Sequence, residues 1–357
     1  MSEPLDTLLH VPVDDHLGLT TGVLTALGVP GPAARDQAEM LLEGDLRGHA
    51  SHGLRRLDIL ASRLRNGVAQ AAAEPTLSWS TPSVLLVDGC GGLGPPTARH
   101  AVRALLERVR DAGLAVAAVR NAQHLGMLAP YVEAMAGEGV VGIALTTSEA
   151  LVHPWGGIRP LVGTNPLAVA VPVAGAEPVV LDMATGQVSR GKVIDHAARD
   201  LPLAPGDAVD ARGAPTTDAT AALDGAISPF GGAKGYALGV VLEVLVATLT
   251  RSALGEQVRG TLDATDPSTK GDLLIALDPR HFGPGTAEVA AYVDALRAEP
   301  PAPGHERVLV PGDRSRSTRA ANLTHGVPVG RDTWTRAREV AVEVGAVPPS
   351  GRTDRRE

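Results

Sequence analysis

The amino-acid sequence predicts an α/β protein that begins with a helical domain. In the first 70 or so residues, leucines recur at three- and four-residue spacing, which is typical of helices with one apolar face. From about residue 83, short apolar runs that suit strands alternate with helical stretches. The chain of 357 residues contains 41 Gly and 28 Pro, which divide it into short elements. We expect a helical domain at 1–75, an α/β domain at 76–310, and a C-terminal segment at 311–357 that returns to the helical domain.

Two helices are expected in the helical domain. A Pro-Gly-Pro break at 30–32 precedes a stretch of helix-forming residues at 33–45. A second helix is expected to begin at Ser51, whose hydroxyl suits an N-cap, and to end at the Asn-Gly pair 66–67. This arrangement places His52 in the first turn of the second helix.

The rest of the chain is expected to fold into strands and helices in alternation. The expected strands are 84–87, 114–119, 140–146, 167–171, 179–181 and 273–277, and the expected helices are 97–110, 127–138, 234–250 and 285–297. The stretch 201–229 is rich in Ala, Asp, Gly, Pro and Thr, so we expect a long surface loop there. One short helix is expected in the tail after Trp334.

Composition narrows the class of function. The chain has 32 Lys and Arg against 40 Asp and Glu, a net charge of -8, with only three Trp, three Tyr and two Phe. Nucleic acid is not an expected partner, because its binding rests on cationic surface and often on aromatic stacking. The first residues lack the pattern of an export signal, and Glu243 interrupts the longest apolar run, so we expect a cytoplasmic protein without a membrane span. The single cysteine, Cys90, cannot form an internal disulfide and is interpreted as a small packed residue.

The densest polar cluster is the segment DLRGHASHG at 45–53. Arg47 could hold a carboxylate through two parallel hydrogen bonds, while a histidine near neutral pKa exchanges a proton. A structural interpretation stays open, in which Ser51 only caps a helix and Arg47 only pairs with Asp45. A third interpretation makes His49 and His52 metal ligands of a hydrolase, although the sequence offers no nearby third ligand.

Two glycine-rich segments raise the question of phosphate binding. Gly89, Gly91 and Gly94 match the GxGxxG pattern between a strand and a helix, as in a dinucleotide fingerprint. The next strand ends at Arg120, where that fingerprint requires an acidic residue, so the match is weak. Lys234 follows two glycines at the start of an apolar helix, where it could meet a phosphate or could be a solvated charge.

Further polar residues fall at strand ends between 121 and 192. Loops at strand ends are where α/β proteins build sites. The candidates are His124, Trp155, Thr164, Asn165, Asp182 and Lys192.

These motifs in this order resemble the type 2 malate/L-lactate dehydrogenase family, from about residue 15 to 335. The motifs are RGHASHGLRR, NAQHLG, PWGG followed by VGTNPLAVAVP, LDMATGQVSRGK, GGAKGYAL and VPGDRS. The family also includes ureidoglycolate, sulfolactate and diketogulonate oxidoreductases and cyclic-imine reductases. The resemblance implies a homodimer and a nicotinamide-binding domain that is not a Rossmann fold, which counts against the fingerprint at Gly89.

The resemblance also implies roles for individual residues. His52 would be the proton donor, with Ser51 beside it and Arg47 as carboxylate partner, while His124 would be the second active-site histidine, in a role left open. Cofactor contacts would come from Val180, Leu181, Asp182, Met183, Ala184, Thr185, Lys234, Gly312 and Asp313. No metal is implied.

Four positions depart from the family pattern. Leu125 stands where an aromatic is usual, Thr147 where asparagine is frequent, Gly186 for serine and Asp313 for glutamate. Leu125 and Thr147 are expected nearer the substrate, so they bear on its identity.

We therefore expect an NAD- or NADP-dependent oxidoreductase that transfers a hydride between nicotinamide and a small 2-oxo or 2-hydroxy acid. A cyclic imine carboxylate is the alternative substrate, and a binding protein without activity is a further alternative. Arg190 could meet the extra phosphate of NADP, or could be a surface arginine.

Overall fold

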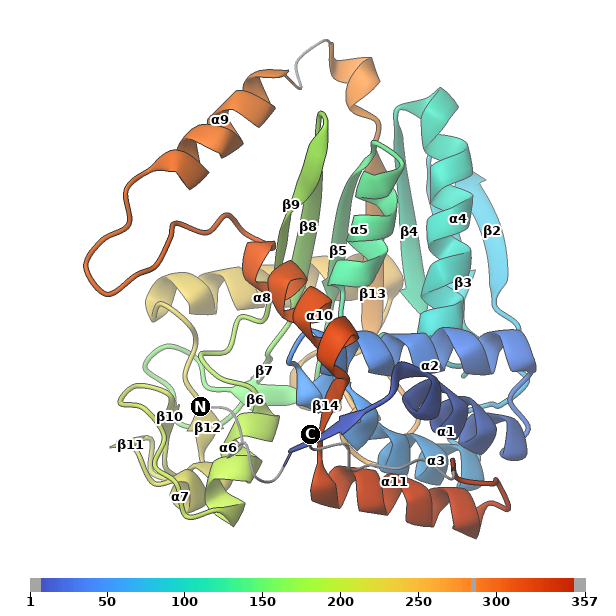
Figure 1. The fold of residues 1–357 in the computed structure, drawn as a ribbon, viewed down its shortest axis with the longest axis vertical. Helices are drawn as coiled ribbons and strands as arrows, with labels where there is room; N and C mark the ends of the chain where they lie inside the picture. The colour runs from blue at the N-terminus through green and yellow to red at the C-terminus, as the bar shows by residue number, and fades with distance from the viewer. Residues whose placement is uncertain (1–7, 284–286, 350–357) are drawn as a thin grey trace.

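A computed structural model describes residues 8–283 and 287–349 and has a seven-stranded mixed sheet at its centre (Figure 1). The strand order is β2–β3–β4–β13–β5–β8–β9, and only the β3–β4 pair is parallel. The bounds are β2 Thr76–Thr81, β3 Val84–Asp88, β4 Leu114–Arg120, β5 Val141–Thr146, β8 Leu167–Val173, β9 Ala176–Met183 and β13 Gly271–Leu277. The six expected strands are confirmed, and β2 is an additional edge strand.

Helices cover both faces of this sheet. Helices α4 (Gly94–Ala112) and α5 (Ala129–Gly137) pack on one face, where Leu105 and Val132 join a core with strand residues such as Leu274. Helix α8 (Ala233–Thr250) packs on the other face through Leu242 and Val246. Side chains alternate along each strand, so a sheet buried on both faces needs apolar residues at successive positions, as β4 and β13 have.

A helical layer lies against one end of the sheet (Figure 1). It contains α1 (Val13–Ala26), α2 (Gly31–Leu46), α3 (Leu57–Arg65) and α11 (Arg331–Glu343), which share one core. Strand β1 (Leu8–Val11) pairs with β14 (Val327–Gly330), and α10 (Asp313–His325) packs on α2. Residues 313–343 therefore lie beside the first helices. Arg99 of α4 joins the two layers through hydrogen bonds to Asp36 and Glu39 of α2.

The second helix of the sequence prediction begins later than expected, and the prediction that Ser51 caps it is wrong. Two 3-10 turns, η2 (Ala50–His52) and η3 (Leu54–Arg56), precede α3, so His52 does not lie in a helical first turn. The cause is Asp45, whose buried carboxylate accepts a hydrogen bond from the Leu54 amide at 2.7 Å and fixes the chain there.

The prediction of a long surface loop at 201–229 is also wrong. This stretch folds into β10 (Ala208–Val209), β11 (Pro215–Thr216), α7 (Ala219–Leu223) and β12 (Ala226–Ile227). The three strands among these elements form a five-stranded sheet with β6 (Ala150–Val152) and β7 (Val162–Gly163). This small sheet packs with α7 and α6 (Arg190–Ala198) around a small core of its own. Short apolar residues such as Ala208 and Ala222 fill that core, and their modest hydrophobicity explains why the sequence pattern did not reveal it.

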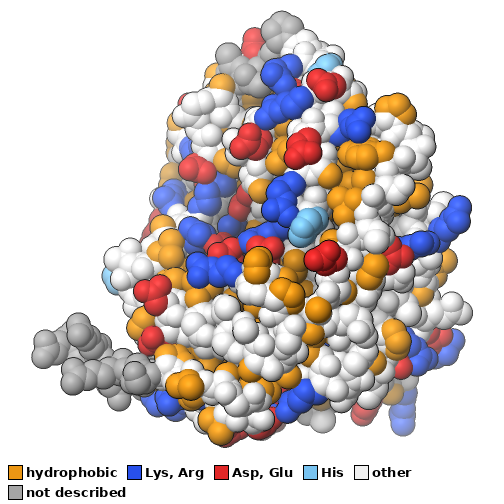
Figure 2. Space-filling model, turned by 90° about the vertical axis from the view of Figure 1, so that its right-hand side faces the viewer, with side chains coloured by type: hydrophobic (Ala, Val, Ile, Leu, Met, Phe, Trp, Pro, Cys, Tyr) orange, Lys and Arg blue, Asp and Glu red, His pale blue; other side chains and the backbone are white. Residues whose placement is uncertain are grey.

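Three elements remain. The 3-10 turn η4 (Gly255–Gln257) contacts β7 of the small sheet, η5 (Pro279–Phe282) follows β13, and α9 (Ala287–Ala298), which covers most of the helix expected at 285–297, contacts β8. Helix α8 is the one described helix that is long and apolar enough to cross a membrane, but part of it is buried against the sheet and its Glu243 binds Asn165 at 2.7 Å. On the face shown in Figure 2, the Lys and Arg side chains are interspersed with Asp and Glu.

Candidate functional site

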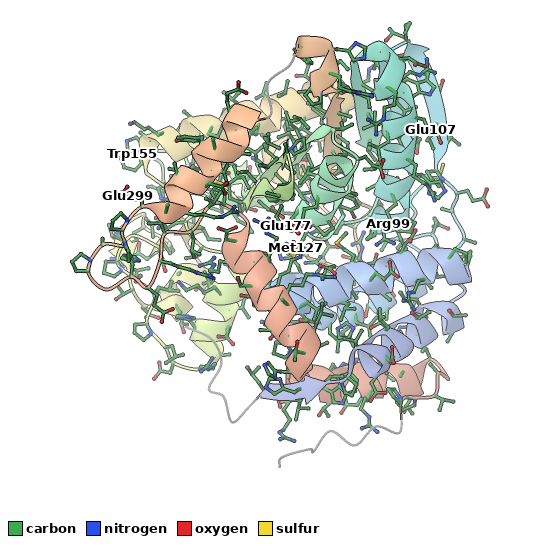
Figure 3. The ribbon with its side chains drawn as sticks, turned by 45° about the horizontal axis from the view of Figure 1, so that its top comes forward. Arg99, Glu107, Met127, Trp155, Glu177 and Glu299 are labelled. Carbon is green, nitrogen blue, oxygen red and sulfur yellow. The ribbon has the colours of Figure 1, made fainter. Side chains whose placement is uncertain are left out.

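A pocket of about 310 Å³ lies where the helical layer, the large sheet and the small sheet meet. In Figure 3 the labelled Met127, one of its lining residues, lies at the centre of the molecule. The lining comes from seven stretches of the chain: 49–56, 124–128, 146–151, 164–166, 182–184, 189–191 and 261–262. The pocket has the size and mixed polarity of a small-molecule site.

Two histidines lie next to each other in the lining of this pocket. The rings of His52 and His124 have centroids 5.5 Å apart and an interplanar angle of 37°. His52 Nδ1 lies 3.1 Å from the hydroxyl of Ser51, and His124 Nδ1 accepts a hydrogen bond from the Gly126 amide at 3.0 Å. Since Nδ1 of His124 accepts, its neutral ring carries the hydrogen on Nε2.

The surroundings of both histidines favour the uncharged ring. Burial lowers the pKa of His52 to about 3, and the charges of Arg56 and His49 act in the same direction. Burial, Arg56, His52 and Lys270 hold the pKa of His124 well below its ordinary value. An imidazole next to a cation and partly withdrawn from water loses its proton readily, because its charged form is poorly solvated there.

Asp45 places the turn that carries His52. Its carboxylate binds the Leu54 amide and, at 2.9 Å, the Nε2 atom of His16 on α1. Gly44 and Gly53 allow the approach: a Cβ at Gly44 would lie 2.6 Å from the His52 carbonyl carbon, and one at Gly53 would overlap the Asp45 carboxylate. Burial raises the pKa of Asp45, while the hydrogen bond from His16 opposes this.

Arg47 does not line the pocket, in contrast to its expected role as carboxylate partner. Its guanidinium donates at 2.7 Å to each oxygen of Glu133 and at 2.8 Å to Glu43, so its donors are used within the protein. The alternative pairing of Arg47 with Asp45 is absent as well, because Asp45 faces His16. Burial lowers the pKa of Arg47, but the hydrogen bonds and charges of Glu133 and Glu43 outweigh it and raise the pKa.

Arg56 occupies the pocket wall instead. It follows His52 by four residues, lines the pocket and donates a hydrogen bond to the Thr261 carbonyl at 2.5 Å. Burial lowers the pKa of Arg56 to about 10, which the nearby Glu149 opposes and Arg63 reinforces. It remains a cation at neutral pH and can bind an anion. The sequence motif RGHASHGLRR contains Arg56, but the spacing gave no reason to prefer it over Arg47.

Part of the expected cofactor segment reaches the pocket. Asp182, Met183 and Ala184 line it at the end of β9. One oxygen of Asp182 accepts hydrogen bonds from the amides of Leu128 at 3.1 Å and Ala129 at 2.7 Å, at the start of α5. Burial raises the pKa of Asp182 to about 6, although these amides oppose the change.

The preceding and following residues of that segment do not line the pocket. Val180 donates its amide to the Pro311 carbonyl at 3.0 Å, and Leu181 pairs with Val169 in the sheet. Thr185 is buried, and its hydroxyl donates to the Thr164 carbonyl at 2.9 Å. These side chains support the pocket wall from behind.

Lys234, Gly312 and Asp313 also lie outside the pocket lining. Lys234 is exposed in the first turn of α8. Gly312, with φ 98°, is the residue before α10, and Asp313 pairs with Arg297 at 2.9 Å and with Arg316 at 2.8 Å. The hydrogen bond from Arg297 holds the pKa of Asp313 well below its usual range. Within this chain, the 310–313 turn is tied to β9 through Val180 rather than to the pocket.

The positions that depart from the family pattern divide into two groups. Leu125 and Thr147 line the pocket, but Thr147 has its hydroxyl engaged with the Gly271 amide at 3.0 Å. Gly186 packs under the small sheet against Ile227.

The other strand-end candidates are dispersed. Thr164 and Arg190 line the pocket, and Arg190 also donates to the Leu223 carbonyl at 3.2 Å. Asn165 binds the buried Glu243, Lys192 pairs with Asp207 at 3.1 Å, and Trp155 lies exposed at the periphery (Figure 3).

The glycine-rich turn at 89–94 has a structural role. The amides of Gly89 and Gly91 donate to the carbonyls of Arg120 at 2.9 Å and Asn121 at 2.7 Å. The donors that a dinucleotide phosphate would need are therefore used within the protein. His49 and His52 both line the pocket, but no group of three or more residues able to hold a metal occurs within 8–283 and 287–349.

The 258–268 loop contributes Thr261 and Leu262 to the pocket lining, and no motif in the sequence marks it. Arg63 donates to the carbonyls of Asp263 at 2.5 Å and Asp266 at 3.0 Å, and Arg56 binds Thr261. Glu149 accepts from the amides of Thr261 at 2.7 Å and Leu262 at 2.8 Å, which brings Leu262 to the pocket. These contacts join residues between 112 and 205 positions apart in the sequence, so no local sequence pattern predicts them.

Comparisons with known proteins agree over most of the chain. A profile of the malate/L-lactate dehydrogenase family matches residues 11–337. Malate/(S)-sulfolactate dehydrogenase of Methanothermus fervidus is 33% identical over 331 residues, 93% of this chain and 97% of that protein. Delta(1)-pyrroline-2-carboxylate reductase of Pseudomonas fluorescens is 37% identical over 323 residues, 89% of this chain and 95% of that protein. The crystal structure of a dehydrogenase from Sinorhizobium meliloti superposes with a TM-score of 0.90 at 46% identity, covering 93% of this chain and 98% of that one.

Proposed function

The chain belongs to the malate/L-lactate dehydrogenase family of NAD(P)-dependent oxidoreductases, and on that premise we propose that its central pocket reduces a small 2-oxo acid or oxidises the matching 2-hydroxy acid. The observation that carries this proposal is the pair of facing imidazoles, His52 and His124, beside the guanidinium of Arg56. Proton exchange and carboxylate binding are the two tasks that such a reaction leaves to the protein.

Arg56 is the proposed anchor of the substrate carboxylate. It is the cation on the wall beside His52, and a guanidinium can hold a carboxylate with two hydrogen bonds. A bound anion also offsets the charge that lowers the pKa of His52. Substrate binding thus favours the protonated His52 that the reduction requires, and His52 then gives its proton to the substrate oxygen.

The residues present fit a nicotinamide at the end of β9. Met183 and Ala184 offer an apolar wall for a flat ring, and the first turn of α6, with Ser189 and Arg190, brings polar groups to the same side. When bound, the nicotinamide supplies the hydride chemistry. The protein residues would hold it beside the substrate, with Thr261 and Leu262 also lining the pocket.

A cyclic imine carboxylate is the second proposed substrate class. Relatives at 34–37% identity carry the names of pyrroline-2-carboxylate reductases, so the same residues are compatible with that chemistry. The apolar lining residues Leu125, Leu151 and Leu262 would suit the methylene groups of a saturated ring. In this reaction His52 would protonate nitrogen in place of oxygen.

The test of the proposed function is a paired measurement on the wild type and His52→Gln. We expect the wild type to oxidise NADH or NADPH in the presence of a 2-oxo acid or a cyclic imine carboxylate. The variant should lose turnover by orders of magnitude while cofactor binding, followed by nicotinamide fluorescence, stays the same. An undiminished rate in the variant would remove His52 from the mechanism.

We further propose that the chain forms a homodimer through the outer face of α8 in the cytoplasm. Val241, Val244, Leu245 and Leu249 lie on that face at helical spacing and are 61%, 50%, 40% and 50% exposed. A contiguous apolar stripe of this kind suits a two-fold contact with a second copy, in which the same surface serves both subunits.

Substitution on that stripe tests the dimer. Val241→Lys should convert the protein to a monomer in light scattering after size-exclusion chromatography, because a buried unpaired charge is costly at an interface. The control is Val342→Lys on α11, which is 67% exposed and lies elsewhere on the surface. A wild type that is already monomeric at micromolar concentration would contradict this proposal.

A further inference from the structure

One carboxylate in the pocket lining has no part in the chemistry described so far. Glu149 lies between β5 and β6 and lines the pocket. A single oxygen, Oε1, accepts hydrogen bonds from the Thr261 amide at 2.7 Å, the Thr261 hydroxyl at 3.0 Å and the Leu262 amide at 2.8 Å. Among the residues that the structure describes, none binds the second oxygen, Oε2. Glu149 therefore brings a negative charge to the pocket wall.

The same loop residue joins Glu149 to the proposed carboxylate anchor. Arg56 donates to the Thr261 carbonyl at 2.5 Å, while Glu149 accepts from the Thr261 amide. The guanidinium and the carboxylate thus bind the backbone of one residue, and both side chains line the pocket. A substrate whose carboxylate binds Arg56 would therefore have Thr261 and Leu262 among its neighbours.

Leu262 offers an apolar surface to the remainder of such a substrate. Its side chain lines the pocket and is still 42% exposed, so much of it is available for contact. Leu125 and Leu151 also line the pocket. Each methylene group that is buried against an apolar wall raises affinity about fourfold. A charged group at the same wall would lose water and gain no partner.

The second cation of the lining is bound to another part of the molecule. Arg190, in the first turn of α6, donates to the Leu223 carbonyl at 3.2 Å, at the end of α7. The acidic side chains of the lining are Glu149 and Asp182. A substrate with one carboxylate can pair with Arg56. A second carboxylate would instead enter a pocket that already contains two acids.

We propose that Glu149 and Leu262 are specificity-determining residues, which favour an acid with one carboxylate and an aliphatic remainder over an acid with a second negative charge. The proposal rests on the function proposed above. Leu262 favours the first class through apolar contact, and Glu149 disfavours the second through charge repulsion. Aliphatic 2-oxo acids and cyclic imine carboxylates both belong to the favoured class.

The experiment compares two acids of four carbons that differ in a terminal methyl or carboxylate group. Racemic 2-hydroxybutyrate and malate are each titrated by calorimetry into the full-length protein saturated with NADH. No reaction follows, because the cofactor and both acids are already in their reduced forms. We expect the wild type to bind 2-hydroxybutyrate about tenfold or more tightly than malate, since only malate carries a charge without a partner.

Two variants separate the effect of charge from that of apolar contact. Glu149→Gln keeps an oxygen for the loop amides but removes the charge, so it should improve malate binding on the order of fivefold relative to 2-hydroxybutyrate. Leu262→Asn replaces an apolar side chain by a polar one of similar size. It should weaken 2-hydroxybutyrate binding on the order of fivefold relative to malate.

The matched control is Glu107→Gln, which makes the same charge change at an exposed position of α4 (Figure 3). Its ratio of affinities should equal that of the wild type. The inference is overturned if the wild type binds malate as tightly as 2-hydroxybutyrate, or if Glu149→Gln leaves the ratio unchanged. Should Glu149→Gln fail to fold, the wild-type ratio and Leu262→Asn still decide. A wild type that reduces neither 2-oxobutyrate, nor oxaloacetate, nor a cyclic imine carboxylate contradicts the proposed function, whereas the binding ratio tests the selection separately.

Discussion

At the scale of single residues, two arginines of one motif have different surroundings. Arg47 is held by Glu43 and Glu133, whereas Arg56 lies on the pocket wall with one hydrogen bond to a backbone carbonyl. A guanidinium already bound to two carboxylates has few free N–H donors for a substrate. Arg56, in contrast, carries a positive charge that an entering carboxylate can bind.

The pair Arg56→Met and Arg47→Met tests this difference. Arg56→Met should raise KM for the acid substrate on the order of 100-fold, because about 3 kcal/mol of charge-assisted hydrogen bonding is lost. Arg47→Met should instead lower the thermal midpoint, because it leaves Glu43 and Glu133 without a shared partner, and it should leave KM nearly unchanged. Steady-state kinetics and thermal unfolding of both variants provide the measurements. The reverse pattern would restore Arg47 as the carboxylate partner.

The residues that the sequence could predict are those that sit in a local motif. Ser51, His52 and His124 all reach the pocket, as do Asp182, Met183 and Ala184. Motif spacing could not separate Arg47 from Arg56, because their difference depends on Glu133, which is 86 residues away.

At the scale of elements, the turn η2–η3 is the part of the structure that presents His52. It is held by Asp45 and by the close contact of Gly44 and Gly53, not by an N-cap at Ser51. The helical period of the leucines predicted a continuous helix from residue 51 because those leucines do face the core. The helix is interrupted at Gly53 by the buried carboxylate of Asp45, which belongs to α2. The spacing of apolar residues does not predict such a contact.

The close contact of Gly53 with the Asp45 carboxylate leads to a specific prediction. Gly53→Ala should destabilise the protein by about 2 kcal/mol or more and should reduce turnover, because the added methyl group displaces either Asp45 or the turn with His52. The matched control is Gly18→Ala in α1, where nothing lies within 4 Å of the new Cβ. That control should be neutral or stabilise the helix by up to about 1 kcal/mol. Chemical denaturation and turnover of both variants are the measurements, and equal behaviour of the two would contradict the assigned role of the turn.

At the scale of the whole molecule, the large sheet was predictable and the small one was not. The strands β3, β4, β5, β8, β9 and β13 have apolar residues on both faces, which produced clear signals. The strands β10, β11 and β12 have two residues each, and only β12 joins them to β6 and β7, through its pairing with β6. A sheet built from such short pieces is a product of tertiary contacts, so its sequence resembles a loop.

Uncharged imidazoles at the pocket should make the folded state sensitive to acid. The folded-state pKa values of His52 and His124 lie below the ordinary value of about 6.5, so below that pH the unfolded chain binds protons that the folded protein does not. The free energy of unfolding should therefore fall as pH decreases from about 6.5, by up to about 1.4 kcal/mol per pH unit for each histidine. Asp182, with its raised pKa of about 6, acts in the opposite direction below that pH and reduces the net slope.

A comparison of the wild type with the double variant His52→Gln/His124→Gln separates the contribution of the two histidines to this pH dependence from that of the carboxylates. Urea denaturation at pH 7 and at pH 5 should show a smaller loss of stability in the double variant, because glutamine does not titrate while Asp182 and the ion pairs remain. His305→Gln is the control, since that exposed imidazole lies in the loop before α10 and should leave the pH dependence unchanged. If the double variant lost as much stability between pH 7 and pH 5 as the wild type, the lowered pKa values of the two histidines in the folded protein would be ruled out.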